Sequence, residues 1–304
     1  MSVALPGSIE RNRLHSATPS FFGIVRGEFI KISRMWQIWL MLLMWLGVIT
    51  LPYLVQTTND STAQRLKEGA LAFFYSEMEL NLAVLRIFSG FFLLILTAYV
   101  IGQEYHFGTI RIVLARGVGR LQLLGAKVLA VVLVALMLFI VGVLYNIILI
   151  CALLAIIAGN LNSLSALTPA FWSNTELYML SVLISMGVTI LLAVCVSIIG
   201  RGLAFGLSAS LAWFAVDNFG LLFLIIAAEA THNTSWLQIS AYALGPNLNA
   251  MPRVLLPAQL KAIEIGITPL VPIDATHTLL IALGYALIFA VTAIILIWKR
   301  DVKE

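Results

Sequence analysis

The sequence predicts an all-α polytopic membrane protein with six transmembrane helices. Hydrophobic residues make up 61% of its 304 residues and charged residues only 11%, whereas a soluble domain holds about 25% charged residues. Such a chain has too little polar surface to be wetted on all sides. It also contains six runs of low charge, each near the length of about 20 residues that a helix needs to cross the hydrocarbon core. An even number of spans brings both termini to the same side.

The first 34 residues are expected to form a cytoplasmic N-terminus (1–34) that is polar at first and then amphipathic. Phe22, Val25, Phe29 and Ile32 recur at helical spacing, and lysine and arginine residues supply the polar side. This pattern is typical of a helix that lies on the inner membrane surface and leads into the first span. An ordinary basic flank of that span is the alternative interpretation.

A single transmembrane domain is expected over residues 1–304, with six spans inside 35–298 and a cytoplasmic tail at 299–304. The spans are placed on runs with little or no charge: 35–55, 84–102, 128–158, 177–199, 203–228 and 276–298. At 1.5 Å per residue the third run is roughly 46 Å long, which exceeds the hydrocarbon core. This span must therefore tilt, kink or project outward.

Two outer connections are long enough to hold structure of their own. Residues 56–83 are expected to form a polar loop that includes a helical-looking stretch at 62–80. Residues 229–275 contain five prolines, so no single long helix fits there. Their apolar pieces, at 236–244 and 254–260, are expected to form short helices at the outer interface.

The distribution of charge predicts that both termini lie in the cytoplasm. With the N-terminus inside, all but five of the 18 lysines and arginines fall in cytoplasmic segments. The five cations assigned to the outer side are Arg65, Lys67, Arg86, Arg253 and Lys261. Cytoplasmic loops of membrane proteins carry such an excess of positive charge. This bias explains the net charge of +4 better than nucleic-acid binding does, so no nucleic-acid partner is expected.

The polar interruption with the most concentrated positive charge runs from Glu104 to Lys127. It holds one acid, Glu104, and four cations: Arg111, Arg116, Arg120 and Lys127. A short basic loop between two spans is expected on the cytoplasmic side. The apolar residues of 110–114 suit one face of a short interfacial helix, and two glycines then end that helix.

This stretch resembles the permease subunits of ABC-2-type transporters. The positions that carry the resemblance are, in order, Glu104, Gly108, Thr109, Arg111, Val113, Leu114, Arg120 and Lys127. ABC-2 permeases use the loop as a coupling helix that docks into a separate ATP-binding subunit. The resemblance therefore implies contact with that subunit through Glu104, Tyr105, Gly108, Thr109, Arg111, Arg116 and Arg120. The chain departs from the family pattern at Arg116–Gly117, where many members have a Pro-containing turn.

The resemblance extends from the N-terminal helix, where Glu28-Phe-Ile-Lys31 is similar to the usual family wording, to the last span. It implies that two permease subunits pair, as a homodimer or a heterodimer, and that two ATP-binding subunits join them. ATP and Mg belong to the partner subunit in this scheme, and this chain binds no cofactor. The family consists largely of exporters, so the resemblance implies that this chain takes part in export. It also implies a dimer embedded in the lipid of the cell membrane. That membrane is expected to be the plasma membrane of a prokaryote.

The residues themselves give no sign of an enzyme. The stretch from Gly119 to Lys127 comes nearest to a nucleotide-binding loop, but it has five residues between its glycines and an alanine before the lysine. It therefore fails the Walker-A pattern. The four histidines are dispersed along the chain, with no helical pair to hold a metal. ATP hydrolysis is expected on another chain, with no catalytic or metal site here.

One acid, Asp217, lies deep inside the fifth run, next to Asn218. A carboxylate near mid-membrane is costly unless it is paired, wetted or protonated, so Asp217 is expected to face the bundle interior or a cavity. One interpretation is a group that lines a transport pathway or senses a cation. The other is a protonated or hydrogen-bonded packing group near a dimer seam.

Other function classes stay open on sequence grounds. An ATP-independent channel or carrier is expected to show more polar residues inside the membrane, and an inverted repeat. A membrane scaffold needs neither feature, and an intramembrane enzyme lacks its catalytic set. The permease subunit of an ATP-driven exporter is the interpretation that accounts for the basic loop.

Overall fold

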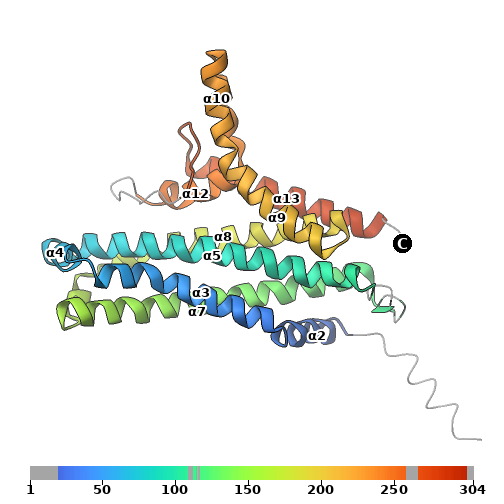
Figure 1. The fold of residues 1–304 in the computed structure, drawn as a ribbon, viewed down its shortest axis with the longest axis horizontal. Coiled ribbons are helices and arrows are strands. Elements are labelled where there is room, and N and C mark those ends of the chain that lie inside the picture. Colours follow the sequence, from blue (N-terminus) through green and yellow to red (C-terminus); the bar gives the residue numbers. More distant parts are fainter. Residues whose placement is uncertain (1–19, 109–111, 114, 116, 258–265, 300–304) are drawn as a thin grey trace, which may run out of the picture.

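A computed structural model describes residues 20–108, 112–113, 115, 117–257 and 266–299. These residues form α-helices and two short 3₁₀ helices, with no strand among them, which confirms the predicted all-α class. The long helices lie side by side roughly along one axis (Figure 1): α3 (Trp36–Thr57), α5 (Ala70–His106), α7 (Arg120–Ala158), α8 (Pro169–Gly200), α9 (Leu203–Phe219) and α13 (Ala275–Lys299).

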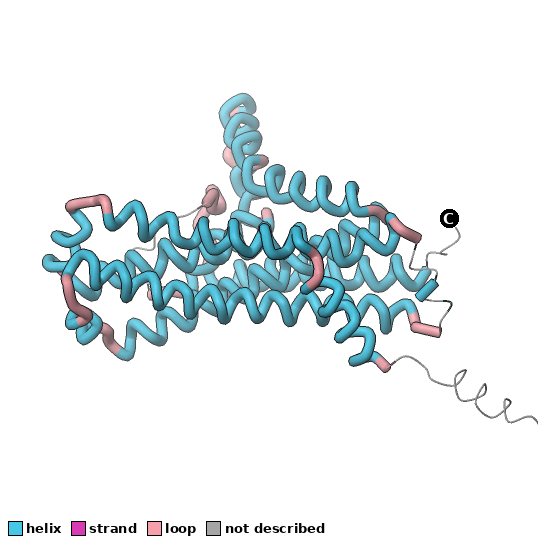
Figure 2. Tube along the Cα trace, turned by 60° about the horizontal axis from the view of Figure 1, so that its bottom comes forward, coloured by secondary structure: helices cyan, strands magenta, loops and turns pink. Residues whose placement is uncertain are grey.

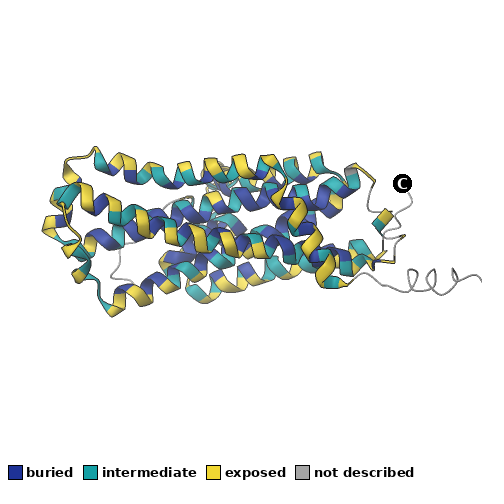
Figure 3. Cartoon of the chain, turned by 90° about the horizontal axis from the view of Figure 1, so that it is seen from below, coloured by how far each residue is buried: buried dark blue, intermediate teal, exposed yellow. Residues whose placement is uncertain are grey.

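Six segments of the described chain are long and apolar enough to cross a membrane, the number that the sequence predicts. Five are single helices and the sixth is the pair α9–α10, with α10 at Leu221–Thr231. The most apolar windows of α5 and α8 are 61% and 67% buried, against 22% for α3 and 17% for α13. Thus α5 and α8 form the centre, and the surrounding helices turn apolar side chains outward, as contact with lipid requires (Figure 3).

The second span is much longer than the sequence predicts. Its expected range was 84–102, but α5 begins at Ala70 and contains 37 residues. Buried apolar residues continue at helical spacing toward its start: Phe74, Met78, Leu82 and Leu85. Because this stripe packs on neighbouring helices, it stabilises a helix in spite of the charges between its members. The polar loop expected at 56–83 is reduced to α4 (Ser61–Glu68) and short connections.

Charged residues of α5 lie inside the bundle, both in its extra length and in the expected range. Glu77 and Glu79 of the extra length and Arg86 of the expected range are only 2–4% exposed. Glu77 accepts hydrogen bonds from Gln56 Nε2 and from Asn81 Nδ2, and such partners lower the cost of burying a charge. Arg86, which the sequence assigns to the outer cations, is therefore a buried residue of a membrane-spanning helix.

The third and fourth spans also begin earlier than predicted. α7 covers the expected 128–158 but starts at Arg120, and its 39 residues extend over roughly 58 Å. It ends at Gly159, whose φ of 69° is the left-handed conformation that glycine adopts most easily. α8 starts at Pro169 rather than near 177, because Thr168 caps it by accepting a hydrogen bond from the N–H of Phe171.

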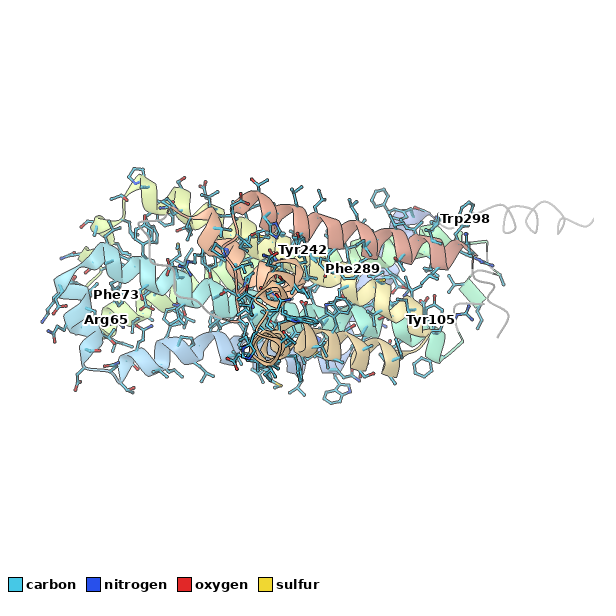
Figure 4. All side chains as sticks on the ribbon, turned by 90° about the horizontal axis from the view of Figure 1, so that it is seen from above. Arg65, Phe73, Tyr105, Tyr242, Phe289 and Trp298 are labelled. Atoms are coloured by element: carbon cyan, nitrogen blue, oxygen red, sulfur yellow. The ribbon has the colours of Figure 1, made fainter. Side chains whose placement is uncertain are left out.

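The fifth span is not one straight helix. α9 ends beside Gly220, and α10 continues as a separate helix that projects from the bundle of long helices (Figures 1 and 2). The view of Figure 4 looks almost along the axis of α10, so α10 runs at a steep angle to the bundle. Glycine is a weak helix former, which agrees with a break at this residue.

Three short helical pieces follow α10: α11 (Ser235–Gln238), η2 (Ile239–Tyr242) and α12 (Leu244–Leu255). The short helix predicted at 236–244 is confirmed as α11 and η2. The helix predicted to begin at 254 is wrong, because α12 ends there instead, while residues 258–260 lie outside the described residues. α12 packs against α8, α9 and α13, and the prediction that no single long helix fits this link is confirmed.

The predicted amphipathic helix near the N-terminus is α2 (Phe21–Ser33), which packs on α7. Its buried residues are Val25, Glu28 and Ile32, whereas Phe22 is 75% exposed. The predicted helix is therefore confirmed, and its place on the inner membrane surface stays a prediction. Val25 and Ile32 of the apolar stripe face the protein, and Glu28 on the same side forms an ion pair with a lysine of α7.

Packing between α5 and α9 is very close at Gly102. A Cβ atom added at this position would lie 2.7 Å from Cα of Leu203.

Gly102→Ala is therefore expected to push α9 away from α5 and to lower the apparent melting temperature of the purified protein, at a cost of about 1–3 kcal/mol. The control is Gly187→Ala in α8, where nothing lies within 4 Å. This change should leave the melting temperature unchanged or raise it, because alanine is the better helix former. Equal melting temperatures for the two variants contradict the close packing.

Candidate functional site

The basic loop leaves α5 and enters α7 at one end of the bundle, which we call the loop end. Figure 4 places Tyr105 and Trp298 at this end and Arg65 and Phe73 at the opposite end. Four charged side chains from α2, α5 and α7 meet at the loop end, and we call them the ionic cluster: Glu28, Lys31, Glu104 and Lys127.

Lys127 is the most deeply buried cation of the ionic cluster, at 4% exposure. Its Nζ atom lies 3.0 Å from Glu28 Oε2 of α2 and 2.9 Å from Glu104 Oε1 of α5. It also donates to the carbonyl oxygen of Val100 at 2.9 Å. An ammonium group has three donors, so all three are used. Lys127 thereby joins α7 to both α2 and α5.

Lys31 completes the ionic cluster from its solvent side. Its Nζ atom lies 2.9 Å from Glu28 Oε1 and 3.1 Å from Glu104 Oε1, and its side chain is 46% exposed. Two carboxylates thus face two ammonium groups, so the cluster has no net charge. Glu104 Oε2 is the one carboxylate oxygen of the cluster with no hydrogen-bond partner in the described part of the chain.

The pKa values of the two α2 residues show which protonation states the cluster favours. Burial alone raises the pKa of Glu28, but Lys127 and Lys31 outweigh burial and hold that pKa below its usual value. Burial alone lowers the pKa of Lys31, but Glu28 and Glu104 outweigh it and raise that pKa. A lowered acid pKa adds stability that is lost only as pH falls through it, and a raised lysine pKa adds stability that is lost only as pH rises through it. Glu28 and Lys31 are therefore both ionised at neutral pH.

The structure places the residues of the predicted coupling loop in different environments. Glu104 is buried in α5 and Tyr105 is half-buried against the core. Gly108 is exposed with a φ of 65°, a conformation that glycine tolerates, and Arg120 begins α7. Three further positions lie outside the described residues: Thr109, Arg111 and Arg116. The coupling helix and its contact with an ATPase therefore stay predictions.

Asp217 lies near the end of α9 and contacts the first turn of α12. Its Oδ1 atom accepts a hydrogen bond from the N–H of Leu244 at 3.1 Å, and its Oδ2 atom accepts one from the N–H of Gly245. The first N–H groups of a helix lack partners within the helix and carry partial positive charge. Asp217 thus stabilises the start of α12. A Cβ atom at Gly245 would lie 2.8 Å from Asp217 Oδ2, so the contact depends on glycine.

Asn218, beside Asp217, is buried and joins α9 to the middle of α12. Its side-chain oxygen accepts a hydrogen bond from Asn249 Nδ2 at 2.9 Å, and its own amide donates to the carbonyl of Phe214. Asp217 and Asn218 both line a cavity between α5, α8, α9 and α12. The expectation that Asp217 faces a cavity agrees with this position, and the assignment of these residues to a pathway rather than a dimer seam stays a prediction.

A third charged or polar contributor to this cavity, Arg86, comes from α5. Its Nη1 atom donates to the carbonyl of Leu248 at 2.7 Å and its Nη2 atom to Asn249 Oδ1 at 3.1 Å. Pro252 lies four residues after Leu248 and has no N–H, so the Leu248 carbonyl lacks its usual partner within the helix. Arg86 supplies a donor in its place. α12 is thus held at its start by α9 and at its middle by α5.

Comparison with known families agrees with these features. Residues 24–231 match the family model described as "ABC-2 family transporter protein". The matched residues include α2, the basic loop, the helices on both sides of the loop, and α9 with α10. The chain belongs to the ABC-2 transporter family. A search of curated proteins finds no match to the chain.

Family membership and the six apolar segments make this chain a multi-pass transmembrane subunit of a transporter. ABC-2 membrane subunits work with an ATP-binding partner. The basic loop at the end of the bundle is the segment that the resemblance assigns to contact with that partner. Within the described residues, no three His, Cys, Asp or Glu side chains gather as metal ligands do. The ionic cluster connects α2, α5 and α7, and Arg86 and Asp217 bring charge to the lining of the cavity inside the spans.

Sequence reasoning missed both the ionic cluster and Arg86. The α2 acid, Glu28, falls on the apolar side of its helix, between Val25 and Ile32, and this placement is the signal that could have indicated a buried partner. For Arg86, the signal is the apolar stripe from Phe74 to Leu85, which predicts a helix that continues through the arginine. The partner of each residue comes from a distant part of the sequence, so its identity needed the structure.

We expect Lys127→Met to destabilise this ABC-2 subunit strongly. The change leaves two buried carboxylates with one half-exposed lysine, and breaking a buried ion pair costs about 3–5 kcal/mol. Lys31→Met is the matched control, and its cost should be at most about 1 kcal/mol because that side chain is 46% exposed. The apparent melting temperatures of the purified variants measure the difference. If both variants melt together, Lys127 is not the residue that holds the three helices.

Proposed function

We propose that this chain is the permease subunit of an ATP-driven exporter in a cell membrane, the plasma membrane of a prokaryote. The observation that carries the proposal is the ionic cluster, which joins α2, α5 and α7 at the base of the basic loop. The loop supplies Arg111, Arg116 and Arg120, whose charges suit an acidic docking surface on the ATP-binding subunit. Export is favoured because the family consists largely of exporters.

The proposed mechanism treats the loop and its flanking helices as one lever. ATP and Mg bind to the partner subunit, and closure of two such subunits moves the docked loop. Because Lys127 ties α7 to Glu28 and Glu104, movement of the loop passes to α2, α5 and α7 together. α5 then carries it over 18 residues from Glu104 to Arg86, roughly 27 Å along the helix, to the cavity under α12.

The proposed assembly contains two permease subunits and two ATP-binding subunits, surrounded by membrane lipid. The permease pair is a homodimer or a heterodimer. Apolar side chains exposed on α3, α9 and α10 leave ample surface for lipid and for a second permease. The cytoplasmic side is assigned to the loop end, following the excess of positive charge there, and no nucleic acid takes part.

An ATP-independent carrier is the second candidate, because the spans hold more charge than the sequence predicts. Glu77, Glu79 and Arg86 lie inside α5 rather than in a loop, and Asp217 lies near the end of α9. Charged residues inside membrane spans often mark substrate or ion pathways. A membrane scaffold has no need of such residues.

Purification of the complex from native membranes in mild detergent distinguishes these functions. We expect a soluble protein with a Walker-A motif to co-purify in stoichiometric amount, as identified by mass spectrometry. Reversing the loop charges with Arg111→Glu and Arg116→Glu should reduce the recovered ATPase at least about tenfold, since several charge-assisted contacts are lost.

The control for this experiment is Lys67→Glu, an exposed residue of α4 at the opposite end of the bundle. It should leave recovery of the ATPase unchanged. If no ATPase co-purifies with a folded wild-type chain, the ATP-driven function is wrong and the carrier becomes the better account. If the loop reversal and the control recover equal amounts, docking does not use the loop.

A further inference from the structure

Arg86 is a buried cation inside a membrane-spanning helix, and only 4% of it is exposed. The guanidinium group is always charged in proteins, so it cannot escape the cost of burial by losing a proton. Its guanidinium group donates hydrogen bonds to a backbone carbonyl and to an amide oxygen, those of Leu248 and Asn249. Both partners are uncharged, so they supply dipoles and leave the positive charge uncompensated.

The ion pairs described above, those of the ionic cluster at the loop end, do not include Arg86. In addition, Arg86 Nε is buried and has no hydrogen-bond partner in the described part of the chain. A buried charge without a partner is strongly unfavourable, and an unsatisfied buried donor adds to the cost. A polar or anionic partner placed beside Arg86 would lower both costs.

The nearest acid in the cavity, Asp217, already has its own positive partner. Both of its oxygens accept backbone N–H groups, from Leu244 and Gly245 at the start of α12. Its negative charge is therefore directed at the end of a helix rather than at the guanidinium group of Arg86. The two charged groups of the cavity therefore differ. Both oxygens of Asp217 accept hydrogen bonds, whereas Arg86 Nε has no hydrogen-bond partner in the described part of the chain.

The cavity beside Arg86 is small and has walls of mixed character. It leaves about 50 Å³ for the centres of water-sized molecules, which is room for a few such molecules. Ser185 and Thr189 of α8 contribute hydroxyl groups to the lining, and Trp213 and Phe214 of α9 contribute aromatic surface. A small anionic group, such as a carboxylate, fits this volume, whereas a large polyanion does not.

We infer that Arg86 forms the anion-binding element of a ligand site between α5, α8, α9 and α12. The ligand class is a molecule with a small monoanionic group of carboxylate type. Such a group accepts a charge-assisted hydrogen bond from Arg86 Nε and neutralises the guanidinium charge. Its role as a transported substrate rests on the proposed transporter function, whereas the binding of an anion by the isolated chain does not.

The probe for this inference is acetate, compared with the neutral, similarly shaped acetamide. Both are titrated into the purified full-length chain, with a bulky sulfonate buffer ion keeping the ionic strength constant. A ligand that binds only the folded state raises its melting temperature in a concentration-dependent way. We expect acetate to raise the apparent melting temperature of the wild-type chain and acetamide to leave it unchanged.

Arg86→Gln is expected to weaken the acetate response at least about tenfold, the loss of one charge-assisted hydrogen bond. The change also removes the hydrogen bonds that hold the middle of α12, so the melting temperature without acetate is expected to fall, and the acetate response is measured from that baseline. Lys67→Gln, which removes an exposed cation of α4, is the control and should retain the full response. Equal acetate responses in the wild type and Arg86→Gln, or equal responses to acetate and acetamide, overturn the inference.

A second variant tests the cavity without removing the arginine. Gly90 lies on the cavity wall, and the nearest atom to an added Cβ is Thr189 Oγ1 at 4.0 Å. Gly90→Leu should fill the cavity and abolish the acetate response while Arg86 remains. A full response in Gly90→Leu shows that acetate binds elsewhere.

Octanoate and its neutral methyl ester identify the source of the anionic group. Binding of octanoate at least tenfold tighter than acetate, lost in Arg86→Gln, indicates that the group belongs to an amphiphile such as a fatty acid. Equal affinities indicate a small free anion. Because neither titration uses ATP or a partner, a failed search for an ATPase does not decide this test.

Discussion

The structure depends on the cost of placing a charge away from water, and the ionic cluster shows how that cost is met. Lys127 is accommodated inside the bundle because two carboxylates and one carbonyl surround its three donors. Each carboxylate comes from a different helix, so the same contacts that neutralise the lysine also bring α2, α5 and α7 together. The contacts that neutralise Lys127 are therefore the same contacts that hold the three helices together at the loop end.

The middle of the same helix, α5, has a different electrostatic arrangement. There Arg86 has uncharged partners and an unsatisfied donor, whereas the ionic cluster is neutral and almost completely paired. α5 is one of the two central helices and packs against α8 and α9. A continuous helix that joins the ionic cluster to Arg86 connects the basic loop with the cavity that we assign to a ligand. This connection is the physical basis of the proposed coupling.

Much of the fold follows from the sequence, because lipid imposes long apolar runs that are visible without a structure. The six spans, the helix at 21–33 and the short helices near 236–242 are of this kind. Prediction failed where tertiary contacts override local polarity. The charges between 77 and 86 indicate a loop by composition, yet they are buried in α5 beside a continuous apolar stripe. The pairing of Glu28 with Lys127, 99 residues apart, and the contact of Arg86 with α12 depend on long-range packing that no local pattern encodes.

The central claim is that movement of the loop reaches the cavity through α5. Hydrogen exchange of the complex purified from native membranes, with and without a non-hydrolysable ATP analogue, tests it most directly. The account predicts that ATP changes the protection of amides in the loop and, together with them, of the amides of Leu244 and Gly245, which hydrogen-bond to Asp217. A change confined to the loop, with unaltered protection at the start of α12, contradicts the account.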